Sequence, residues 1–232
     1  MGAVLRADFH FDLPEALIAQ VPAPARDGSR LLAMGRAAGA IAHRAFRELP
    51  GLLRAGDLLV FNDTRVIPAR LIGQKQSGGR AELLLIEPDP GDVERRRWKA
   101  MGQSSKPLRA GAEVRFKAFS AAIDEVHGEG FFTVSFNLAG AALEQAIASE
   151  GRIPLPPYVR REPNAVDLER YQTLLARAPG SVAAPTAALH FSERVLAELD
   201  AAGVHRTTVT LHVGPGTFLP MRAERVEDHV MH

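Results

Sequence analysis

Hydrophobic and polar positions follow mixed periods over about the first 70 residues of the chain. Residues 12–20 predict a short helix that Asp12 caps and Pro14 opens. Residues 31–34 and 40–46 flank a Gly-containing turn and predict a hairpin, and residues 57–61 predict a buried strand. This mixture is typical of an α/β or α+β fold.

The pattern changes at about Arg70 to short apolar runs that turn residues separate. Such evenly spaced runs predict a small antiparallel β-barrel or sandwich. Residues 140–151 then predict a helix that closes this part of the chain. The predicted strands fall in residues 70–74, 81–88, 97–103, 113–119 and 121–136.

Helical patterns return after an extended stretch at residues 152–161, which is stiffened by three prolines. Residues 166–178 predict one helix, and residues 192–203 predict another that Ser192 caps and Gly203 ends. We therefore predict an α/β domain with an inserted antiparallel β-barrel domain. The α/β domain comprises residues 1–69 and 152–232, and the barrel comprises residues 70–151.

Composition narrows the class of protein. With 232 residues, 46% hydrophobic and 24% charged, the chain has the balance of a soluble globular protein. No apolar run is long enough to span a membrane and no signal-peptide pattern is present, so we expect a cytoplasmic protein. The absence of cysteine excludes disulfides and thiolate chemistry. A net charge of +1 does not indicate nucleic-acid binding, although a local basic patch remains compatible with it.

The first candidate site segment is residues 183–191, which place Pro185, Thr186 and His190 in an otherwise plain apolar run. Proline ends any preceding helix, so His190 is expected on a loop just before the helix that Ser192 caps. Free N–H groups at a helix start suit an electron-rich ligand. The alternative is that this segment is only a tight turn.

The second candidate segment follows the predicted strand at residues 57–61 and contains Asn62, Asp63, Thr64 and Arg65. Open α/β sheets bind ligands beyond the carboxyl ends of their strands, where these polar groups are expected. The alternative is a capped turn in which Asp63 holds local N–H groups.

The third candidate segment is residues 210–218, predicted as a strand that ends in Gly214, Pro215, Gly216 and Thr217. The glycines allow a ligand to approach the backbone closely, but the pattern is not that of a phosphate-binding loop. We expect all three segments to converge on one cleft.

Histidines are concentrated near the end of the chain. Five of the eight lie within residues 190–232. His229 and His232 are spaced to share a helix face and could hold a metal with His190 or His212, yet no metalloprotease signature is present. We therefore expect no metal, and a structural role stays open for each histidine.

A basic cluster in the barrel region runs from Arg95 to Lys99 around Trp98. Strand alternation sends Arg95, Arg97 and Lys99 to one face, and Arg96 and Trp98 to the other. Cations beside an aromatic ring are typical of RNA-binding surfaces and also of an ordinary solvated hairpin.

Taken together, these motifs resemble the S-adenosylmethionine:tRNA ribosyltransferase-isomerase family of queuosine biosynthesis. The resemblance runs along the whole chain, with Ala188 where the family usually has glycine. Members of the family continue past the motif at residues 227–232, so the chain resembles a C-terminally truncated member. We expect such a chain to expose an apolar face and to show little activity alone. The motifs are residues 11–20, 29–32, 56–71, 153–161, 167–173, 180–191, 210–218 and 227–232.

The resemblance implies the family's fold, an α/β domain with an inserted β-barrel, and a specific reaction. The ribosyl part of S-adenosylmethionine is moved onto the aminomethyl group of a deazaguanine wobble base in tRNA and rearranged to an epoxycyclopentanediol. Adenine and methionine are released. The implied partners are tRNA and S-adenosylmethionine, the latter as substrate, so no cofactor is expected; we expect a monomer without a membrane partner.

This chemistry suggests roles for the candidate residues. A base removes the proton next to the sulfonium and an acid assists the departure of adenine, so His190, His212 and His229 are candidates for proton transfer. Asp63 suits the sulfonium, the attacking amine or a ribose hydroxyl, and Arg65 suits a carboxylate or a phosphate. The hydroxyls of Thr186 and Thr217 can orient substrate, and the remaining candidate binding residues are Asn62, Thr64, Gly214 and Gly216.

Two other functions remain open. In the first, the chain is an RNA-binding module whose histidines are structural, and it would release no adenine. In the second, it is a metal hydrolase built on His229 and His232, and it would contain stoichiometric zinc.

Overall fold

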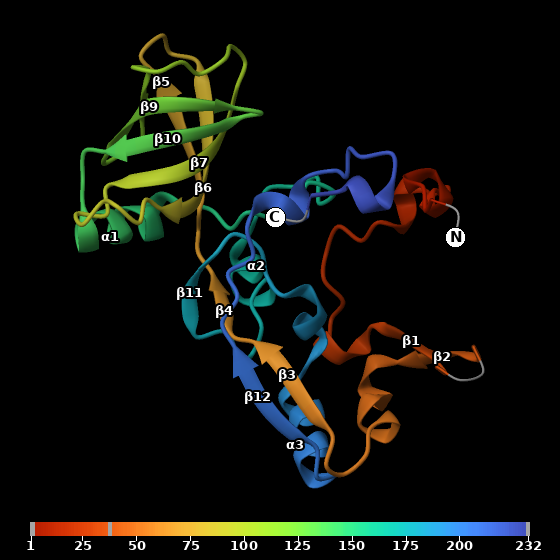
Figure 1. The fold of residues 1–232 in the computed structure, drawn as a ribbon. Helices are drawn as coiled ribbons and strands as arrows, with labels where there is room; N and C mark the ends of the chain where they lie inside the picture. The colour runs from red at the N-terminus through yellow and green to blue at the C-terminus, as the bar shows by residue number, and fades with distance from the viewer. Residues whose placement is uncertain (1–2, 37–38, 231–232) are drawn as a thin grey trace.

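A computed structural model describes residues 3–36 and 39–230 of the chain. It has two parts, a β-barrel and a mixed α/β part that lies below it in Figure 1. The α-helices are α1 (Gly140–Glu150), α2 (Ala165–Arg170) and α3 (Glu193–Ala201). The strands are β1 (Arg30–Met34), β2 (Ile41–Ala45), β3 (Leu58–Asn62), β4 (Thr64–Val66), β5 (Arg70–Lys75), β6 (Arg80–Pro88), β7 (Arg97–Ser104), β8 (Glu113–Arg115), β9 (Ser120–Gly128), β10 (Phe131–Phe136), β11 (Ala178–Ser181) and β12 (His205–Val209).

Short 3-10 helices make up the rest of the helical content in the described ranges. These are η1 (Arg6–Phe9), η2 (Glu15–Leu17), η3 (Arg26–Gly28), η4 (Phe46–Leu52), η5 (Thr186–His190), η6 (Pro215–Phe218) and η7 (Val226–Asp228).

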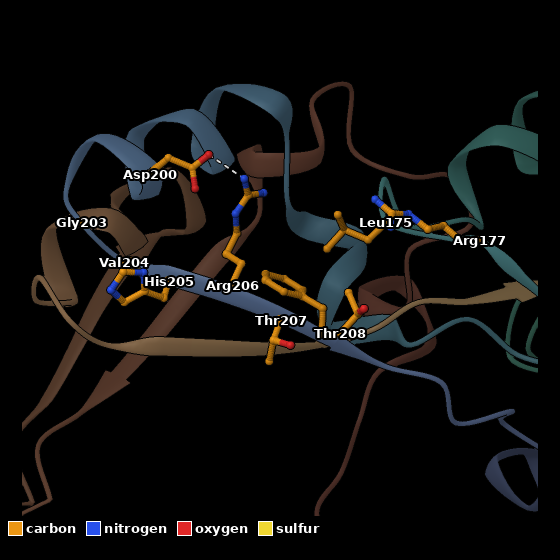
Figure 2. Close-up of a pocket in the computed structure, with 10 residues that line it drawn as sticks. Leu175, Arg177, Asp200, Gly203, Val204, His205, Arg206, Thr207 and Thr208 are labelled. Carbon is orange, nitrogen blue, oxygen red and sulfur yellow. Dashed lines mark hydrogen bonds and ion pairs between the residues drawn. The ribbon is translucent and has the colours of Figure 1, made fainter.

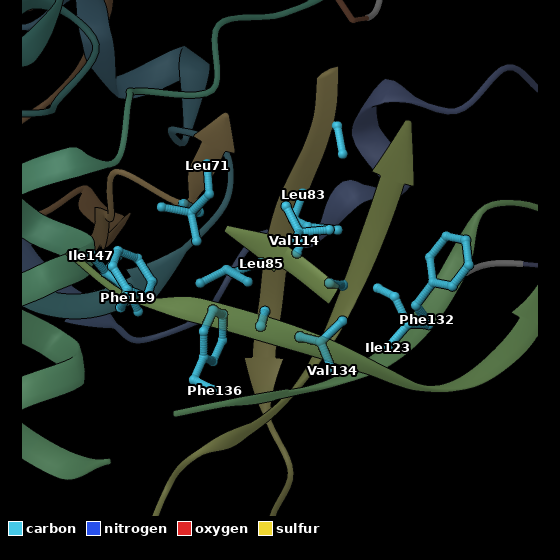
Figure 3. Close-up of a cluster of buried hydrophobic side chains, with 14 of the residues drawn as sticks. Leu71, Leu83, Leu85, Val114, Phe119, Ile123, Phe132, Val134, Phe136 and Ile147 are labelled. Atoms are coloured by element: carbon cyan, nitrogen blue, oxygen red, sulfur yellow. The ribbon is translucent and has the colours of Figure 1, made fainter. Parts of the chain in front are cut away.

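The barrel is closed and antiparallel, with the strand order β10-β7-β6-β5-β8-β9. This confirms the predicted barrel. Inward positions alternate along each strand, as in β6, where Ala81, Leu83 and Leu85 are fully buried. Figure 3 shows Leu83 and Leu85 in the same cluster as Val134 and Phe136 of β10.

Two features complete the barrel core. Leu143 and Ile147 of α1 belong to the same buried cluster, so this helix covers one end of the barrel. At Gly102 in β7, a Cβ atom would lie 2.8 Å from both Leu108 and Phe132. Glycine at this position therefore lets the two large side chains pack against the strand.

The α/β part is built from two short parallel strand pairs. β3 pairs with β12, and β4 pairs with β11. Each pair joins a segment that precedes the barrel in sequence to one that follows it. The mixed α/β character is therefore confirmed, whereas the domain limits at residues 69 and 152 remain a prediction.

Helix α3 packs on one face of β3. Val195 and Leu199 of the helix are fully buried with Phe61 of the strand. The Ser192 hydroxyl accepts a hydrogen bond from the Val195 N–H, and Gly203 follows the helix with φ +75°, as predicted. The predicted hairpin of β1 and β2 is also present.

The predicted helix at residues 12–20 is wrong. Only the three-residue η2 forms there, and Asp12 caps no helix. Leu13 and Leu17 are 51% and 72% exposed. A short helix is not stable without an apolar surface to pack on, which these side chains do not have in this structure.

Two further element predictions are wrong in extent. The helix predicted at residues 166–178 ends at Arg170, because Gln172, two residues later, bonds both backbone groups of Val66 on β4. The strand predicted within residues 210–218 lies upstream as β12, and Thr210 to Gly214 are irregular.

Strand β3 forms where predicted, but the expectation that it is buried is wrong. Leu58 and Val60 are 57% and 59% exposed, and every residue of β12 is exposed. The face of this two-stranded sheet that is turned away from α3 is therefore open and partly apolar, and Val209 and Leu211 add 42% and 64% exposed side chains beside it.

Candidate active site

The carboxyl ends of β3 and β12 lie side by side because the two strands are parallel. Asn62 ends β3, and its side-chain amide clamps the segment after β12. Its Nδ2 donates to the Leu211 carbonyl at 2.7 Å, and its Oδ1 accepts from the Leu211 N–H at 3.1 Å. The same Oδ1 accepts from the Thr64 N–H at 3.1 Å. Asn62, and not Asp63, therefore provides the turn-capping contact.

Asp63 lies at the same strand end. Its Oδ1 accepts a hydrogen bond from the Thr210 hydroxyl at 2.7 Å. Its backbone carbonyl accepts from the N–H groups of Arg177 and Ala178, which lead into β11. The carboxylate is thus held between β4 and the segment after β12, with Oδ2 making no hydrogen bond to a described residue.

Thr64 and His212 form a direct side-chain contact in this region. The Thr64 side chain is fully buried and its Oγ1 lies 2.7 Å from His212 Nδ1. A Cβ atom added to Gly180, whose φ is +144°, would lie 2.8 Å from the ring of His212. The imidazole therefore packs directly on the backbone of β11.

Three stretches meet at this point. Ser181 Oγ accepts from the Val213 N–H at 2.8 Å, and the Val182 N–H donates to the Val213 carbonyl at 3.0 Å. Residues 62–64, 180–183 and 210–213 thus form one polar network. The expected convergence of the second and third candidate segments agrees with these contacts, and the start of the first segment joins them through Ala183.

His190 lies at the other end of that first segment, as the last residue of η5. Its ring centroid is 5.3 Å from that of Phe46, and the neighbouring Phe191 ring packs edge-on against Phe46 and Phe61. Ala188 fills the same cluster with its methyl group. No described hydrogen bond joins His190 to Asp63 or His212, so a cleft shared by all three stays a prediction.

A buried carboxylate supports the helix that follows His190. Asp27 Oδ2 accepts from the Ser192 hydroxyl at 2.7 Å and from the Arg194 guanidinium at 3.0 Å. The Ser192 hydrogen bond, followed by the charge and hydrogen bond of Arg194, lowers the pKa of Asp27 below its usual range. This contact fixes the start of α3 relative to η3.

The other predicted binding residues differ in exposure. Arg65 and Thr186 are exposed, and among the described residues Arg65 has no ion-pair partner. Gly214 and Gly216 are half-buried, Thr217 is exposed in η6, and nothing lies within 4 Å of a Cβ added to Gly214. Open space beside Gly214 is compatible with the expected approach of a ligand.

His229 lies in a different environment. It lines a hollow of about 300 Å³ together with Glu129 and Phe131 at the turn between β9 and β10. None of the residues that line this hollow belongs to the polar network of residues 62–64, 180–183 and 210–213. The structure thus separates His229 from His212.

In the part of the chain that the structure describes, no three His, Cys, Asp or Glu side chains are grouped to hold a metal ion. His232 lies outside the described residues, so its predicted pairing with His229 is not placed.

The basic cluster of the barrel is largely neutralised. Arg97 and Lys99 share a face of β7 while Trp98 packs against the core, but Arg95 and Arg96 precede the strand. Arg97 pairs with Asp89, Asp124 and Glu125, and the other three cations each pair with a glutamate. These pairs favour the solvated hairpin over the RNA-binding surface.

An open hollow of about 600 Å³ is lined by residues of α3 and β12. Figure 2 shows Arg206 in it, bonded to Asp200 at 2.5 Å, and Arg177 at its far side. Phe61 and Thr208 also line the hollow, but none of its lining residues belongs to the polar network of residues 62–64, 180–183 and 210–213. None of the described helices is long and apolar enough to cross a membrane.

The candidate site residues predicted from the sequence do not include Gly180, Ser181 and Thr210, which belong to the network. Thr210 directly follows a run of β-branched residues and has no distinctive pattern. The positive φ and the close approach of the His212 ring explain the glycine, but neither can be read without the position of residue 212.

Comparison with known proteins gives the family. A profile described as "Queuosine biosynthesis protein" matches residues 6–232. Proteins named S-adenosylmethionine:tRNA ribosyltransferase-isomerase are similar to the chain along nearly its whole length. The one from Anaeromyxobacter dehalogenans (strain 2CP-C) is 60% identical over 97% of this chain and 65% of its own length. The one from Xanthomonas oryzae pv. oryzae is 52% identical over 98% and 62%.

A protein of the same name from Geobacter sulfurreducens is 47% identical over 99% of this chain and 66% of its own length. The crystal structure of an S-adenosylmethionine tRNA ribosyltransferase from Thermotoga maritima is 30% identical, with a TM-score of 0.37, over 90% of this chain and 59% of that one. The chain thus spans about 65% of the length of its Anaeromyxobacter relatives. On the match over residues 6–232, the chain belongs to the queuosine biosynthesis protein family.

Proposed function

We propose that the polar network at the ends of β3 and β12 is the active site of an S-adenosylmethionine:tRNA ribosyltransferase-isomerase. In the proposed reaction the ribosyl part of S-adenosylmethionine is transferred to the aminomethyl-deazaguanine wobble base of tRNA. It is rearranged to an epoxycyclopentanediol, which gives epoxyqueuosine-tRNA with release of adenine and methionine. S-adenosylmethionine is the ribosyl donor, so the proposal requires no further cofactor.

One observation carries this proposal. Side chains of Asn62, Asp63, Thr64, Thr210 and His212, drawn from segments about 150 residues apart, are hydrogen-bonded into one cluster at the carboxyl end of a parallel strand pair. A protein that only needed stability would gain little from a half-exposed carboxylate and an exposed imidazole at this place, whereas a site for charged intermediates requires both. The family relationship supports the proposed chemistry, because a relative that is 60% identical is named S-adenosylmethionine:tRNA ribosyltransferase-isomerase.

The proposed roles follow from the geometry. Asp63 has a carboxylate oxygen available for the sulfonium, the amine or a ribose hydroxyl. Arg65 is exposed on the adjacent strand and unpaired among described residues, so it suits the methionine carboxylate or a tRNA phosphate. Thr64 is fully buried, so we propose that it positions His212 and does not contact substrate itself.

We also propose that the barrel of β5 to β10 is an inserted domain. All six strands lie between residues 70 and 136, and the segments on either side pair with each other as β4 with β11 and β3 with β12. The protein would act in the cytoplasm, where tRNA is modified, as a monomer.

The deciding experiment measures adenine released from S-adenosylmethionine with and without tRNA carrying the aminomethyl-deazaguanine base. Because the chain spans 65% of its relatives' length, a chimera extended by the remaining part of the Anaeromyxobacter protein is assayed beside it. We expect tRNA-dependent adenine release from the chimera and little from the chain alone. Release from neither protein would contradict the proposed reaction and favour an RNA-binding module.

A further inference from the structure

Among the described residues, the hydroxyl of Thr64 has a single hydrogen-bond partner. Thr64 is 0% exposed, so no bulk water reaches its side chain. The only hydrogen bond of its Oγ1 to any described residue is the one to His212 Nδ1, at 2.7 Å. Within the part of the chain that the structure describes, His212 is therefore the group that satisfies this hydroxyl.

This geometry distinguishes between the two neutral forms of the imidazole. If Nδ1 carried the proton, it would donate to Oγ1, and the buried O–H of Thr64 would have no acceptor. If Nδ1 is unprotonated, the O–H of Thr64 donates to it, and only oxygen lone pairs remain without a partner. An unsatisfied buried donor costs more than a spare lone pair on an oxygen that already takes part in a hydrogen bond.

Rotation of the His212 ring away from Thr64 is restricted. The ring lies on the backbone of β11 at Gly180, where a Cβ atom would be 2.8 Å from Cε1 and 2.9 Å from Nε2 of His212. Glycine at this position thus provides the flat surface on which the imidazole rests. Thr64 on β4 then fixes the rotation of the ring about its Cβ–Cγ bond.

We infer that Thr64 and Gly180 hold neutral His212 as its Nε2–H tautomer, so that the ring nitrogen that does not face Thr64 is a hydrogen-bond donor. The role assigned to His212 rests on the proposed function. In that reaction Nε2–H stabilises an electron-rich atom of the substrate, such as a ring nitrogen of the departing adenine or a ribose oxygen. His212 does not remove the proton next to the sulfonium, since that step needs an unprotonated Nε2.

The tautomer is measured directly in the free protein. Chain labelled with ¹⁵N-histidine is examined by NMR at about pH 9, above the ordinary imidazole pKa of about 6.5. The His212 resonances are identified by their loss in His212→Asn. Protonated and unprotonated ring nitrogens have well-separated ¹⁵N shifts, and we expect the proton on Nε2. A His212 ring with its proton on Nδ1 would overturn the inference.

Variants of Thr64 test the cause. Thr64→Val removes the hydroxyl and should leave His212 as a mixture of tautomers, whereas Thr64→Ser should restore the Nε2–H form. Thr173→Val is the matched control, because Thr173 is 6% exposed and its hydroxyl has no hydrogen-bond partner among the described residues. An unchanged tautomer in Thr64→Val would contradict the assigned role of the hydroxyl.

Gly180→Ala tests whether the backbone at Gly180 supports the His212 ring. The added methyl group should displace the imidazole and abolish the tautomer preference. The substitution also strains a backbone with positive φ, so Gly56→Ala is the control, since Gly56 has φ +89° and nothing within 4 Å of an added Cβ. If both variants or neither changed the His212 resonances, the proposed support of the ring by Gly180 would be refuted.

The activity measurement is separate. In the form of the protein that releases adenine, Thr64→Val should lower kcat/KM about tenfold and Thr64→Ser should recover it. The tautomer is read without substrate, so a protein with the Nε2–H form that releases no adenine would count against the proposed function alone. Equal kcat/KM in Thr64→Val and wild type would overturn the role of His212 as donor.

Discussion

The Thr210 hydroxyl donates to Asp63 Oδ1 at 2.7 Å, although 147 residues separate the two positions in the chain. This hydrogen bond connects the segment after β12 to the strand end of β3 and leaves Oδ2 without a described partner. The carboxylate is therefore oriented before any substrate arrives, which lowers the entropic cost of binding a cation or an amine.

Replacing Thr210 with valine should free the Asp63 carboxylate and lower kcat/KM for adenine release about tenfold, because a hydrogen bond to a charged group is lost. Thr210→Ser should retain most of the activity. Thr207→Val is the control, since Thr207 is exposed on β12 and its side chain makes no described hydrogen bond. A similar loss in Thr207→Val would assign the effect to the strand and not to Asp63.

The three candidate histidines should differ in their effect on activity. His212→Asn removes a donor at the centre of the polar network and should lower kcat about 10²- to 10³-fold. His229→Asn should have the smallest effect of the three, because His229 lines another hollow beside the barrel. The rates of adenine release of the single variants give the order directly. A larger loss from His229→Asn than from His212→Asn would move the site to the barrel edge.

Arg65 and Arg97 should contribute differently to tRNA binding. Arg65 is exposed and unpaired among described residues, whereas Arg97 already pairs with three carboxylates. Arg65→Gln should weaken binding and reduce the slope of log K against log salt by about 1, and Arg97→Gln should leave the slope unchanged. Titrations at several salt concentrations measure both. A reduced slope of log K against log salt for Arg97→Gln alone would instead support RNA binding by the basic cluster of the barrel.

Much of the fold could be predicted because its signal is local. The barrel strands show alternating burial, and helix α3 carries its own capping residue. The prediction of a helix at residues 12–20 was wrong because the apolar side chains there have no apolar surface to pack on in this structure. Helix propensity alone does not stabilise so short a helix. Residues 166–178 failed because a tertiary contact, Gln172 with Val66, replaced the continued helix.

The site was predictable in its segments but not in its contacts. Polar residues after a strand marked Asn62, Asp63 and Thr64, because their types are unusual there. Nothing in one sequence indicates that Thr64 faces His212 or that Gly180 supports its ring, since both depend on the pairing of β4 with β11.

Asp27 should make the stability of the chain sensitive to acid. Its pKa is lowered by Ser192 and Arg194, so its contribution is complete above the ordinary value of about 3.9 and is lost as the pH falls through the folded-state pKa. At pH 7, Asp27→Asn should reduce the free energy of unfolding by about 1 to 3 kcal/mol. The difference from wild type should shrink below about pH 4.

Urea unfolding of wild type and Asp27→Asn at a series of pH values checks this expectation. Asp12→Asn is the matched control, because Asp12 is exposed and makes no described hydrogen bond. A stability difference that stayed constant down to pH 2.5 would show that the charge of Asp27 is not responsible.

Tyr171 should affect stability at the alkaline end. It is 8% exposed, its hydroxyl has no hydrogen-bond partner among described residues, and burial raises its pKa to about 12. Its contribution is complete below the unfolded-state pKa of about 10, and about 3 kcal/mol is lost as the pH rises to about 12. Tyr171→Phe should abolish this loss without lowering stability at pH 7. Tyr158→Phe, at a 54% exposed position, serves as control in urea titrations from pH 8 to 12, and equal behaviour of the two variants would contradict the prediction.

The separation in sequence between the two halves of the site has a consequence for biosynthesis. The barrel strands pair mainly with their neighbours in the chain, so the barrel can close soon after Phe136 leaves the ribosome. The hydrogen bonds at the strand end near Asn62 cannot form until Gly180 and His212 have been synthesised, so its polar groups remain unpaired until then. The barrel should therefore resist protease early in translation, while residues near Asn62 remain cleavable until β12 has emerged.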